Sequence, residues 1–327
     1  MAPEHGDPAA ASVPPPAIVI DHLTKRLRNG VTAVDDVSLT VHPGEVVGLV
    51  GPNGSGKTVT MKILLGLVRP TSGTATLFGE AVRPGAPVLG RVGALVDGPG
   101  FVPYLSGRRN LDLASRQIRL TGGTPDLDAA VAHSGLGSDI DRPVSDYSHG
   151  MRYRLALAQA LLAQPDLLLL DEPTTGMDPA QVIEVRETIR RRAADGATIV
   201  LSSHQLSEVQ EICTHAAVLR GGRLMASGSM ADLIGGPSRI RLTVTRADQL
   251  DRAVALLSSR PGVSGLDRIG PTSVELEGGP RPVELVESLD GIGITVAAFR
   301  GTTFEDSYLA LFEDGPADRD GPAREAP

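Results

Sequence analysis

The feature that most constrains this chain is the segment Gly51-Pro52-Asn53-Gly54-Ser55-Gly56-Lys57-Thr58, which has the pattern G-x-x-x-x-G-K-[ST]. In this pattern the glycines let consecutive backbone N–H groups point at phosphate oxygens, the lysine reaches the β- and γ-phosphates, and the final hydroxyl can bind Mg²⁺. Residues 45–50 predict a buried strand, and residues 58–65 predict a helix whose N-terminus faces the anion. This strand–loop–helix order favours a phosphate-binding loop over a chance glycine-rich turn.

Length, charge and cysteine content limit the classes of protein to consider. The 327 residues predict two domains, and the net charge of −8 argues against nucleic-acid binding through a basic surface. Cys213 is the only cysteine, which excludes an internal disulfide and a Cys-built metal site and fits a reducing cytoplasm. The sequence shows no signal-peptide pattern and no long apolar run, so we expect that the chain does not cross a membrane.

The residues around the phosphate loop predict an antiparallel β layer followed by a helical insert. Residues 18–20 and 37–41 read as strands joined by a turn at Asn29-Gly30, with a further strand at 75–77. Residues 79–89 read as loop, and the insert extends from about residue 98 to 164, with helical spacing at 110–118, 126–133 and 151–162. Residues 1–16, rich in Ala and Pro, predict a disordered tail.

Two apolar runs beyond the insert predict strands that carry chemistry at their ends. Leu167–Leu170 lies between prolines and ends in Asp171-Glu172, and residues 198–201 lead to His204. Because the carboxyl ends of parallel strands form the ligand-binding edge of such a sheet, we expect these side chains to meet the phosphate loop. Asp171 suits Mg²⁺ coordination, and Glu172 could take a proton from an attacking water. The alternatives are carboxylates that cap the next turn and a structural histidine.

The remaining sequence predicts a smaller second domain. Helices are predicted at 179–195, with Asp178 as N-cap, and at 206–213 and 230–234, with strands at 216–220 and 223–227. Gly235-Gly236-Pro237 reads as a linker, and residues 239–312 show the order β-α-β-β-α-β of a ferredoxin-like fold with a closing helix at 304–312. We therefore predict a nucleotide-binding domain over 17–235, an accessory domain over 239–312, and a disordered tail over 313–327.

Taken together, these segments resemble the ATP-binding subunit of an ABC transporter between about residues 18 and 234. The phosphate loop resembles Walker A, residues 167–172 resemble Walker B with the adjacent glutamate, and His204 matches the switch histidine. Ser148-His149-Gly150-Met151 resembles the signature motif, although Ser148 could also be a simple helix N-cap. Residues 176–179, which include Asp178, resemble the D-loop. Residues 93–111 and 303–309 are most similar to the bacitracin- and daunorubicin-resistance type of exporter subunit.

This resemblance implies a P-loop ABC-type α/β fold that has a mixed sheet core. It also implies a mechanism in which ATP binding and hydrolysis close and reopen a dimer. Two copies would form a homodimer that sandwiches two ATP molecules with Mg²⁺, each ATP lying between the phosphate loop of one copy and Ser148–Met151 of the other. Glu172 would act as general base and His204 would steady the γ-phosphate. Separate permease chains would hold the dimer at the cytoplasmic face of the cell membrane, where it would drive export of a drug, an antibiotic or a lipid.

Two positions depart from the pattern of the family. Asp97 stands where the family usually has a glutamine that senses the metal and the attacking water, so we expect this carboxylate to add charge near Mg²⁺. Leu27 stands near the position of the aromatic residue that usually stacks on adenine, and it offers apolar contact without π-stacking. Because of these departures, a second possible function is that of an ATP-binding sensor that hydrolyses ATP only weakly. A nucleic-acid- or ribosome-associated ABC ATPase is a further alternative, against which the acidic balance and the single phosphate loop argue. An importer is the weakest of these alternatives.

Overall fold

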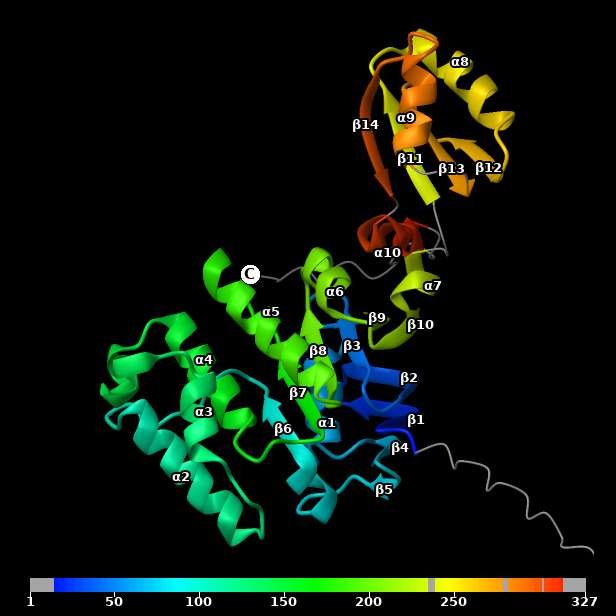
Figure 1. The fold of residues 1–327 in the computed structure, drawn as a ribbon. Helices are drawn as coiled ribbons and strands as arrows, with labels where there is room; N and C mark the ends of the chain where they lie inside the picture. The colour runs from blue at the N-terminus through cyan, green and yellow to red at the C-terminus, as the bar shows by residue number, and fades with distance from the viewer. Residues whose placement is uncertain (1–14, 235–238, 279–281, 302, 314–327) are drawn as a thin grey trace, which may run out of the picture. The chain divides into compact units, whose positions relative to one another are not determined.

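The computed structural model describes residues 15–234, 239–278, 282–301 and 303–313. It divides into two compact units (Figure 1). The first contains the described residues up to His204 together with Ile212–Leu224, and the second contains Gln205–Glu211 with the described residues from Met225 onward. The predicted linker lies outside the described residues, as do nearly all of the two predicted tails.

The predicted antiparallel layer is a four-stranded sheet of the order β2-β1-β4-β5. Its strands are β1 (Ile18–Arg26), β2 (Thr32–Val41), β4 (Ser72–Leu77) and β5 (Glu80–Ala81). Ile18 pairs with Val41 on one side and with Leu77 on the other, and all three side chains are buried. Where the sequence predicted only loop between 79 and 89, the chain forms β5 and enters a short 3₁₀ helix (Pro87–Arg91).

The second sheet of this unit has six strands in the order β10-β9-β3-β8-β7-β6. In chain order they are β3 (Val46–Val50), β6 (Val92–Leu95), β7 (Leu167–Asp171), β8 (Thr198–Ser203), β9 (His215–Arg220) and β10 (Arg223–Ser229). Strands β3, β7 and β8 are buried along their whole length, as their apolar runs predicted. Because β3, β8, β7 and β6 run parallel, their carboxyl ends lie at one edge of the sheet.

Strand β6 is the one strand of this sheet that sequence reasoning missed. Its four residues contain Gly93, which favours neither a strand nor a helix. A Cβ at Gly93 would collide with the carbonyl oxygen of Ala160 at the end of helix α4 (His149–Ala160). The strand is held by parallel pairing with β7, and Gly93 lets the end of α4 pack closely on it, a contact that no local sequence pattern predicts.

The predicted helical insert consists of α2 (Gly107–Leu120), α3 (Leu127–His133) and α4, which gather beside β6 in Figure 1. These helices enclose a hydrophobic core of their own, which includes Leu111, Ile140 and Leu155. Helix α4 begins before the predicted residue 151, because the Ser148 hydroxyl caps it by accepting from Met151 N at 3.2 Å. The other two long helices of this unit are α1 (Lys57–Leu64) and α5 (Pro179–Ala194).

The second unit contains α7 (Met230–Ile234) and most of α6 (Leu206–Ile212), followed by the predicted β-α-β-β-α-β pattern. Its sheet has the antiparallel order β12-β13-β11-β14, which is that of a ferredoxin-like fold and confirms the prediction. The elements are β11 (Arg239–Val244), α8 (Ala247–Ser258), β12 (Val263–Arg268), β13 (Ser273–Gly278), α9 (Pro282–Asp290) and β14 (Val296–Gly301).

Two details complete the second unit. Strand β14 begins at Val296 and not at the predicted Ile292, because Ile292–Ile294 forms a turn in which Gly293 has φ +71° and Ile294 is buried. The predicted closing helix is α10 (Phe304–Glu313), whose first N–H donates to Gln210 Oε1 at 3.0 Å. Among the described residues, no helix combines the length and apolar character needed to cross a bilayer.

Candidate nucleotide site

The phosphate loop joins β3 to α1, and its first and last glycines are fixed by close backbone approaches. A Cβ at Gly51 would collide with the carbonyl oxygen of Leu219, and one at Gly56 would collide with that of Ala33. Gly56 also has φ +102°, which strains any other residue. These approaches explain why the pattern requires glycine at both positions, since neighbouring strands hold the loop at each end.

Two buried polar groups in the loop fit a phosphate chain. Lys57 is 7% exposed and donates from Nζ to the carbonyl oxygens of Gly51 at 2.6 Å and Pro52 at 3.3 Å. Desolvation lowers the pKa of Lys57, and the carboxylates of Glu172 and Asp171 partly oppose this effect. Ser55 Oγ is buried and has no hydrogen-bond partner among the described residues. An anion bound in the loop would give Ser55 an acceptor and would favour the charged form of Lys57.

Asp171, at the end of β7, is held beside Thr58 of the phosphate loop. Its Oδ2 accepts from Thr58 Oγ1 at 2.8 Å, and its Oδ1 accepts from Ser202 Oγ at 2.6 Å. Ser202 Oγ in turn accepts from Glu172 N at 2.9 Å. A carboxylate and a hydroxyl in contact form the small oxygen set by which proteins hold Mg²⁺ when phosphate and water supply the other ligands. The described residues contain no denser His, Cys, Asp or Glu cluster suited to a metal ion.

Glu172 and His204 are in direct contact, as the adjacent strand ends predicted. Glu172 Oε2 accepts from His204 Nδ1 at 2.7 Å and from Thr175 Oγ1 at 2.9 Å. The backbone of Glu172 has φ +50°, a conformation that non-glycine residues rarely adopt. Such backbone conformations cluster at functional sites, where the surrounding contacts keep them in place. The carboxylate of Glu172 is therefore held by two donors, His204 and Thr175, at the edge of the sheet where the parallel strands end.

Asp97 lies in the loop between β6 and α2 and forms an ion pair with Lys62. Oδ2 of Asp97 is 2.6 Å from Lys62 Nζ, and Asp97 has φ +62°. Tyr153 of α4 is buried close by, since a Cβ at Gly98 would be 4.0 Å from its Oη. Burial raises the pKa of Tyr153, and the charges of Asp171 and Glu172 raise it further. Tyr153 of the insert is therefore buried beside Gly98, close enough to Asp171 and Glu172 for their charges to act on its hydroxyl.

The remaining predicted residues bond to partners other than the carboxylates of Asp171 and Glu172. Ser148 caps α4, and His149 Nε2 is 3.0 Å from the carbonyl oxygen of Thr175. Asp178 caps α5 by accepting from Gln181 N at 3.0 Å. Leu27 lies in the turn between β1 and β2 and is 37% exposed. The hydrogen bonds of the Ser148–Met151 segment thus stay within α4 or reach Thr175 of the same chain, the residue before the D-loop.

Sequence reasoning missed four residues that organise the site. Three of them carried a usable signal: Lys62 lies four residues after Thr58 on one helix face, Thr175 lies three after Glu172, and Ser202 is a polar residue at the end of an apolar strand. The fourth, Tyr153, carried none, because its role depends on how the insert packs.

Comparison with known proteins agrees with this geometry. Residues 34–175 match the family model described as ABC transporter. The chain is 36% identical over 308 residues to the Nod factor export ATP-binding protein I of Cupriavidus pinatubonensis, covering 93% of this chain and 94% of that one. It is 38% identical over 195 residues to the bacitracin transport ATP-binding protein BcrA of Bacillus licheniformis, covering 59% of this chain and 63% of that one.

Solved structures show the same fold. A structure titled as the ATP binding subunit of an ABC transporter superposes with a TM-score of 0.60 at 25% identity, covering 66% of this chain and 91% of its own. A dimeric ATP-binding cassette in a post-hydrolysis state with ADP and Pi gives a TM-score of 0.59 at 21% identity, covering 65% and 98%. Since the matching family model and a relative similar along nearly its whole length agree, this chain belongs to the ABC transporter family as an ATP-binding, ATP-hydrolysing subunit.

Proposed function

We propose that this chain powers an exporter by coupling ATP binding and hydrolysis, in a nucleotide-sandwich dimer, to transport by a separate permease. The observation that carries the proposal is the position of Glu172, whose carboxylate is fixed by Thr175 and His204 and lies close enough to influence Lys57. A carboxylate fixed in this way can accept the proton of an attacking water. In the same site, His204 steadies the γ-phosphate.

Thr58 and Asp171 are the residues that would hold Mg²⁺. Their side-chain oxygens are 2.8 Å apart, and both face the end of the phosphate loop. When bound, Mg²⁺ neutralises charge on the β- and γ-phosphates. Ser202 keeps the other carboxylate oxygen of Asp171 in place, so the metal-facing oxygen has a fixed direction. Asp97 adds a further carboxylate to this region, and its charge is balanced by Lys62.

The signature segment supports the dimeric form of the proposal. Ser148–Met151 begins α4, and a helix N-terminus offers backbone N–H groups to an anion. Its own hydrogen bond outside α4 goes to Thr175 of the same chain. In the proposed dimer, a second copy supplies the nucleotide that this segment meets. A structural neighbour with the same fold is described as a dimer bound to ADP and Pi. Leu27 supplies an apolar surface for the base.

The names of the relatives support export through a membrane partner. One relative is described as a Nod factor export protein and another as a bacitracin transport protein. We therefore place this chain at the cytoplasmic face of the membrane, bound to permease subunits, with a drug, antibiotic or lipid as cargo. A weakly hydrolysing ATP sensor is the second candidate, and the replacement of the usual glutamine by an ion-paired Asp97 favours it.

The substitution Glu172→Gln tests the proposed function. It keeps the size of the side chain and removes the base, so we expect ATP to bind, dimers to accumulate and phosphate release to stop. Equilibrium nucleotide binding, light scattering and phosphate release measure these three effects. The exposed Glu80→Gln on β5 is the matched control. Wild-type phosphate release from Glu172→Gln would overturn the assignment of the base.

The exporter and the sensor differ in their response to the membrane partner. The chain is purified from membranes together with the multi-span protein that accompanies it, and phosphate release is measured with and without that protein. Stimulated hydrolysis supports an exporter, whereas a slow rate that the membrane protein leaves unchanged supports the sensor.

A further inference from the structure

The imidazole of His149 joins the signature segment to Thr175 and Gly176, where the D-loop of the same chain begins. Its Nε2 lies 3.0 Å from the carbonyl oxygen of Thr175. Because a carbonyl oxygen can only accept, Nε2 is the nitrogen that carries the proton. The ring is also fixed by contacts, since it lies 4.8 Å from the ring of Tyr153, centroid to centroid, with an interplanar angle of 44°. The side chain of His149 is therefore directed at its own chain.

The D-loop is shaped to receive this ring. A Cβ at Gly176 would lie 3.1 Å from both Cδ2 and Nε2 of His149, which is tighter than nearly all real contacts. Gly176 has φ +76°, so its backbone also favours glycine. Next to this contact, a Cβ at Gly150 would collide with Gln181 Oε1 in the first turn of α5. The start of α4 thus packs against the D-loop and α5 through two close approaches.

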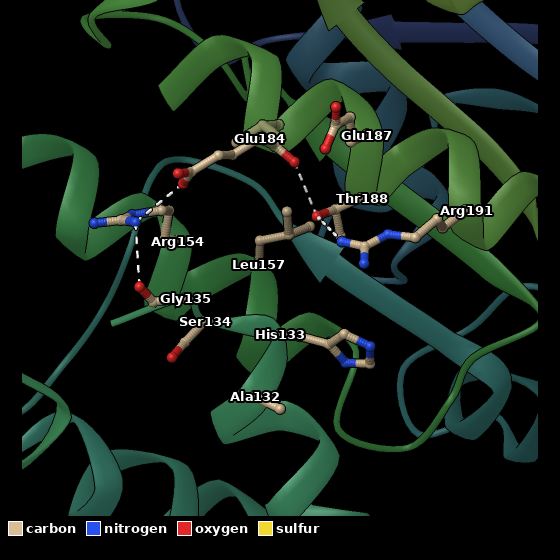
Figure 2. A pocket seen from close by; sticks show the side chains of 11 residues that line it. Ala132, His133, Ser134, Gly135, Arg154, Leu157, Glu184, Glu187, Thr188 and Arg191 are labelled. Atoms are coloured by element: carbon tan, nitrogen blue, oxygen red, sulfur yellow. Dashed lines mark hydrogen bonds and ion pairs between the residues drawn. The ribbon is translucent and has the colours of Figure 1, made fainter. Parts of the chain in front are cut away.

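Beyond its first turns, the contact between α4 and α5 is open. Arg154 Nη1 forms an ion pair with Glu184 at 3.0 Å, and a cavity of about 430 Å³ adjoins this pair. Figure 2 shows the ion pair among the side chains that line this cavity. Leu157 of α4 and Thr188 of α5 line the cavity with the end of α3. The two close approaches of α4 to the D-loop and to α5 therefore both lie at its start, at His149 and Gly150.

Thr175 continues the connection to the catalytic carboxylate. Its carbonyl oxygen accepts from His149, while its hydroxyl donates to Glu172 Oε2 at 2.9 Å. The same Oε2 accepts from His204 Nδ1 at 2.7 Å. A continuous path therefore leads from the signature segment through Thr175 to Glu172 and His204. A shift of the α4 N-terminus relative to the D-loop moves Thr175, and with it one of the two donors that fix the base.

We infer that His149 is a positioning residue that couples the signature segment to Glu172 of its own chain through Thr175. This inference rests on the proposed function, in which the signature segment meets the ATP of the opposite site. ATP bound at the opposite site holds the start of α4 in place. The hydrogen bond between His149 and Thr175 then fixes the position of Thr175, whose hydroxyl donates to Glu172. The base at one site is thereby aligned when the other site is occupied.

The test uses variants that remove one donor and keep the packing. His149→Phe keeps an aromatic ring against Tyr153 and loses the N–H, and Thr175→Val keeps the shape and loses the hydroxyl. We expect each to lower kcat about five- to tenfold, as the loss of about one hydrogen bond does, with KM for ATP within about twofold of wild type. The Hill coefficient for ATP should fall toward 1. The double variant should be no slower than the slower single variant, because both act on one path.

Conservative variants and a binding measurement complete the test. Thr175→Ser and His149→Gln keep a donor, so they should recover most of kcat, and thermal unfolding checks that each variant is folded. In the Glu172→Gln background, His149→Phe should still form the ATP-dependent dimer. A raised KM or a lost dimer would overturn the inference by showing that the ring contacts nucleotide. Additive effects of the two substitutions would overturn it by showing that His149 and Thr175 act independently. Absence of any ATP-dependent dimer in Glu172→Gln alone would instead count against the proposed function.

Discussion

Lys62 Nζ and Asp97 Oδ2 are 2.6 Å apart, and this ion pair connects the helix after the phosphate loop to the loop that enters the helical insert. Lys62 lies one helical turn beyond Thr58 on α1, so the two side chains share a face. Asp97 is therefore anchored next to the Thr58–Asp171 contact. The replacement of a neutral amide by a carboxylate at position 97 is accompanied by a cation that balances it.

The Lys62–Asp97 pair should contribute a small, salt-sensitive stabilisation. The side chains are 28% and 60% exposed, so solvent screens the pair and we expect a coupling free energy of about 0.2–1 kcal/mol. Urea unfolding of Lys62→Met, Asp97→Asn and the double variant measures this coupling as a double-mutant cycle. The coupling should shrink in high salt. Strictly additive costs at low salt would show that the pair contributes nothing.

Ser202→Ala should impair both the stability and the metal dependence of the enzyme. Ser202 is fully buried, donates to Asp171 and accepts from Glu172 N, so the alanine leaves that N–H without its acceptor. We expect a loss of about 1–3 kcal/mol in the free energy of unfolding. Mg²⁺-dependent phosphate release should fall more than nucleotide affinity does, because Asp171 loses its fixed direction. Denaturant unfolding and a Mg²⁺ titration of the rate measure the two effects.

A buried serine outside the site provides the control for Ser202→Ala. Ser115 on α2 is 1% exposed and lies in the helical insert. Ser115→Ala should leave the Mg²⁺ titration unchanged, whatever its effect on stability. An unchanged Mg²⁺ titration in Ser202→Ala as well would refute the role given to Ser202.

His22 and Asp36 should give the chain a pH-dependent surface contact. The hydrogen bond to Asp36, then the charge of that carboxylate, raise the pKa of His22 above 6.5. The contribution to stability is therefore complete below pH 6.5 and is lost as the pH rises through the raised pKa. An NMR titration of the His22 ring in the wild type and in Asp36→Asn measures the shift. Asparagine tolerates the φ of +56° at position 36, so the fold should be kept.

The neighbour Asp21 provides the comparison for this titration. Its carboxylate lies 4.0 Å from His22 Nε2 and raises the pKa of His22 less than Asp36 does. Asp21→Asn should therefore move the titration less than Asp36→Asn. Equal shifts in the two variants would contradict the assignment of Asp36 as the main cause.

Leu242→Ala should destabilise the second unit and spare nucleotide binding. Leu242 is fully buried in a core formed by β11, β13 and the helices α8 and α9, separate from the core around the phosphate loop. We expect a cost of about 2–5 kcal/mol for the unfolding of that unit. Calorimetry should show one shifted transition, while the affinity for ATP is unchanged. As the control, Val200→Ala in the core of the first unit should shift the other transition. Loss of ATP affinity in Leu242→Ala would contradict the proposed division of the chain into two domains at residue 235.

Local patterns in the sequence predicted most of the elements and the central chemistry. The apolar runs before Gly51 and Asp171 predicted buried parallel strands, and parallel strands bring their carboxyl ends to one edge. The contact between Glu172 and His204 follows from that rule, as does the approach of Asp171 to Thr58. The ferredoxin-like order of the second unit was likewise readable from the alternation of its strands and helices.

Only the tertiary structure decided which side chains complete the site. Strand β6 pairs with β7, and its Gly93 admits the end of helix α4. Ser202 and Lys62 contact Asp171 and Asp97 through packing between segments far apart in the chain, and the same packing buries Tyr153 within reach of the charges of Asp171 and Glu172. The orientation of His149 toward Thr175 is of the same kind. Hydrophobic periodicity and glycine patterns act over a few residues and therefore specify elements and strand ends. The direction of a side chain at a shared edge depends on its neighbours in space, which the order of residues along the chain does not reveal.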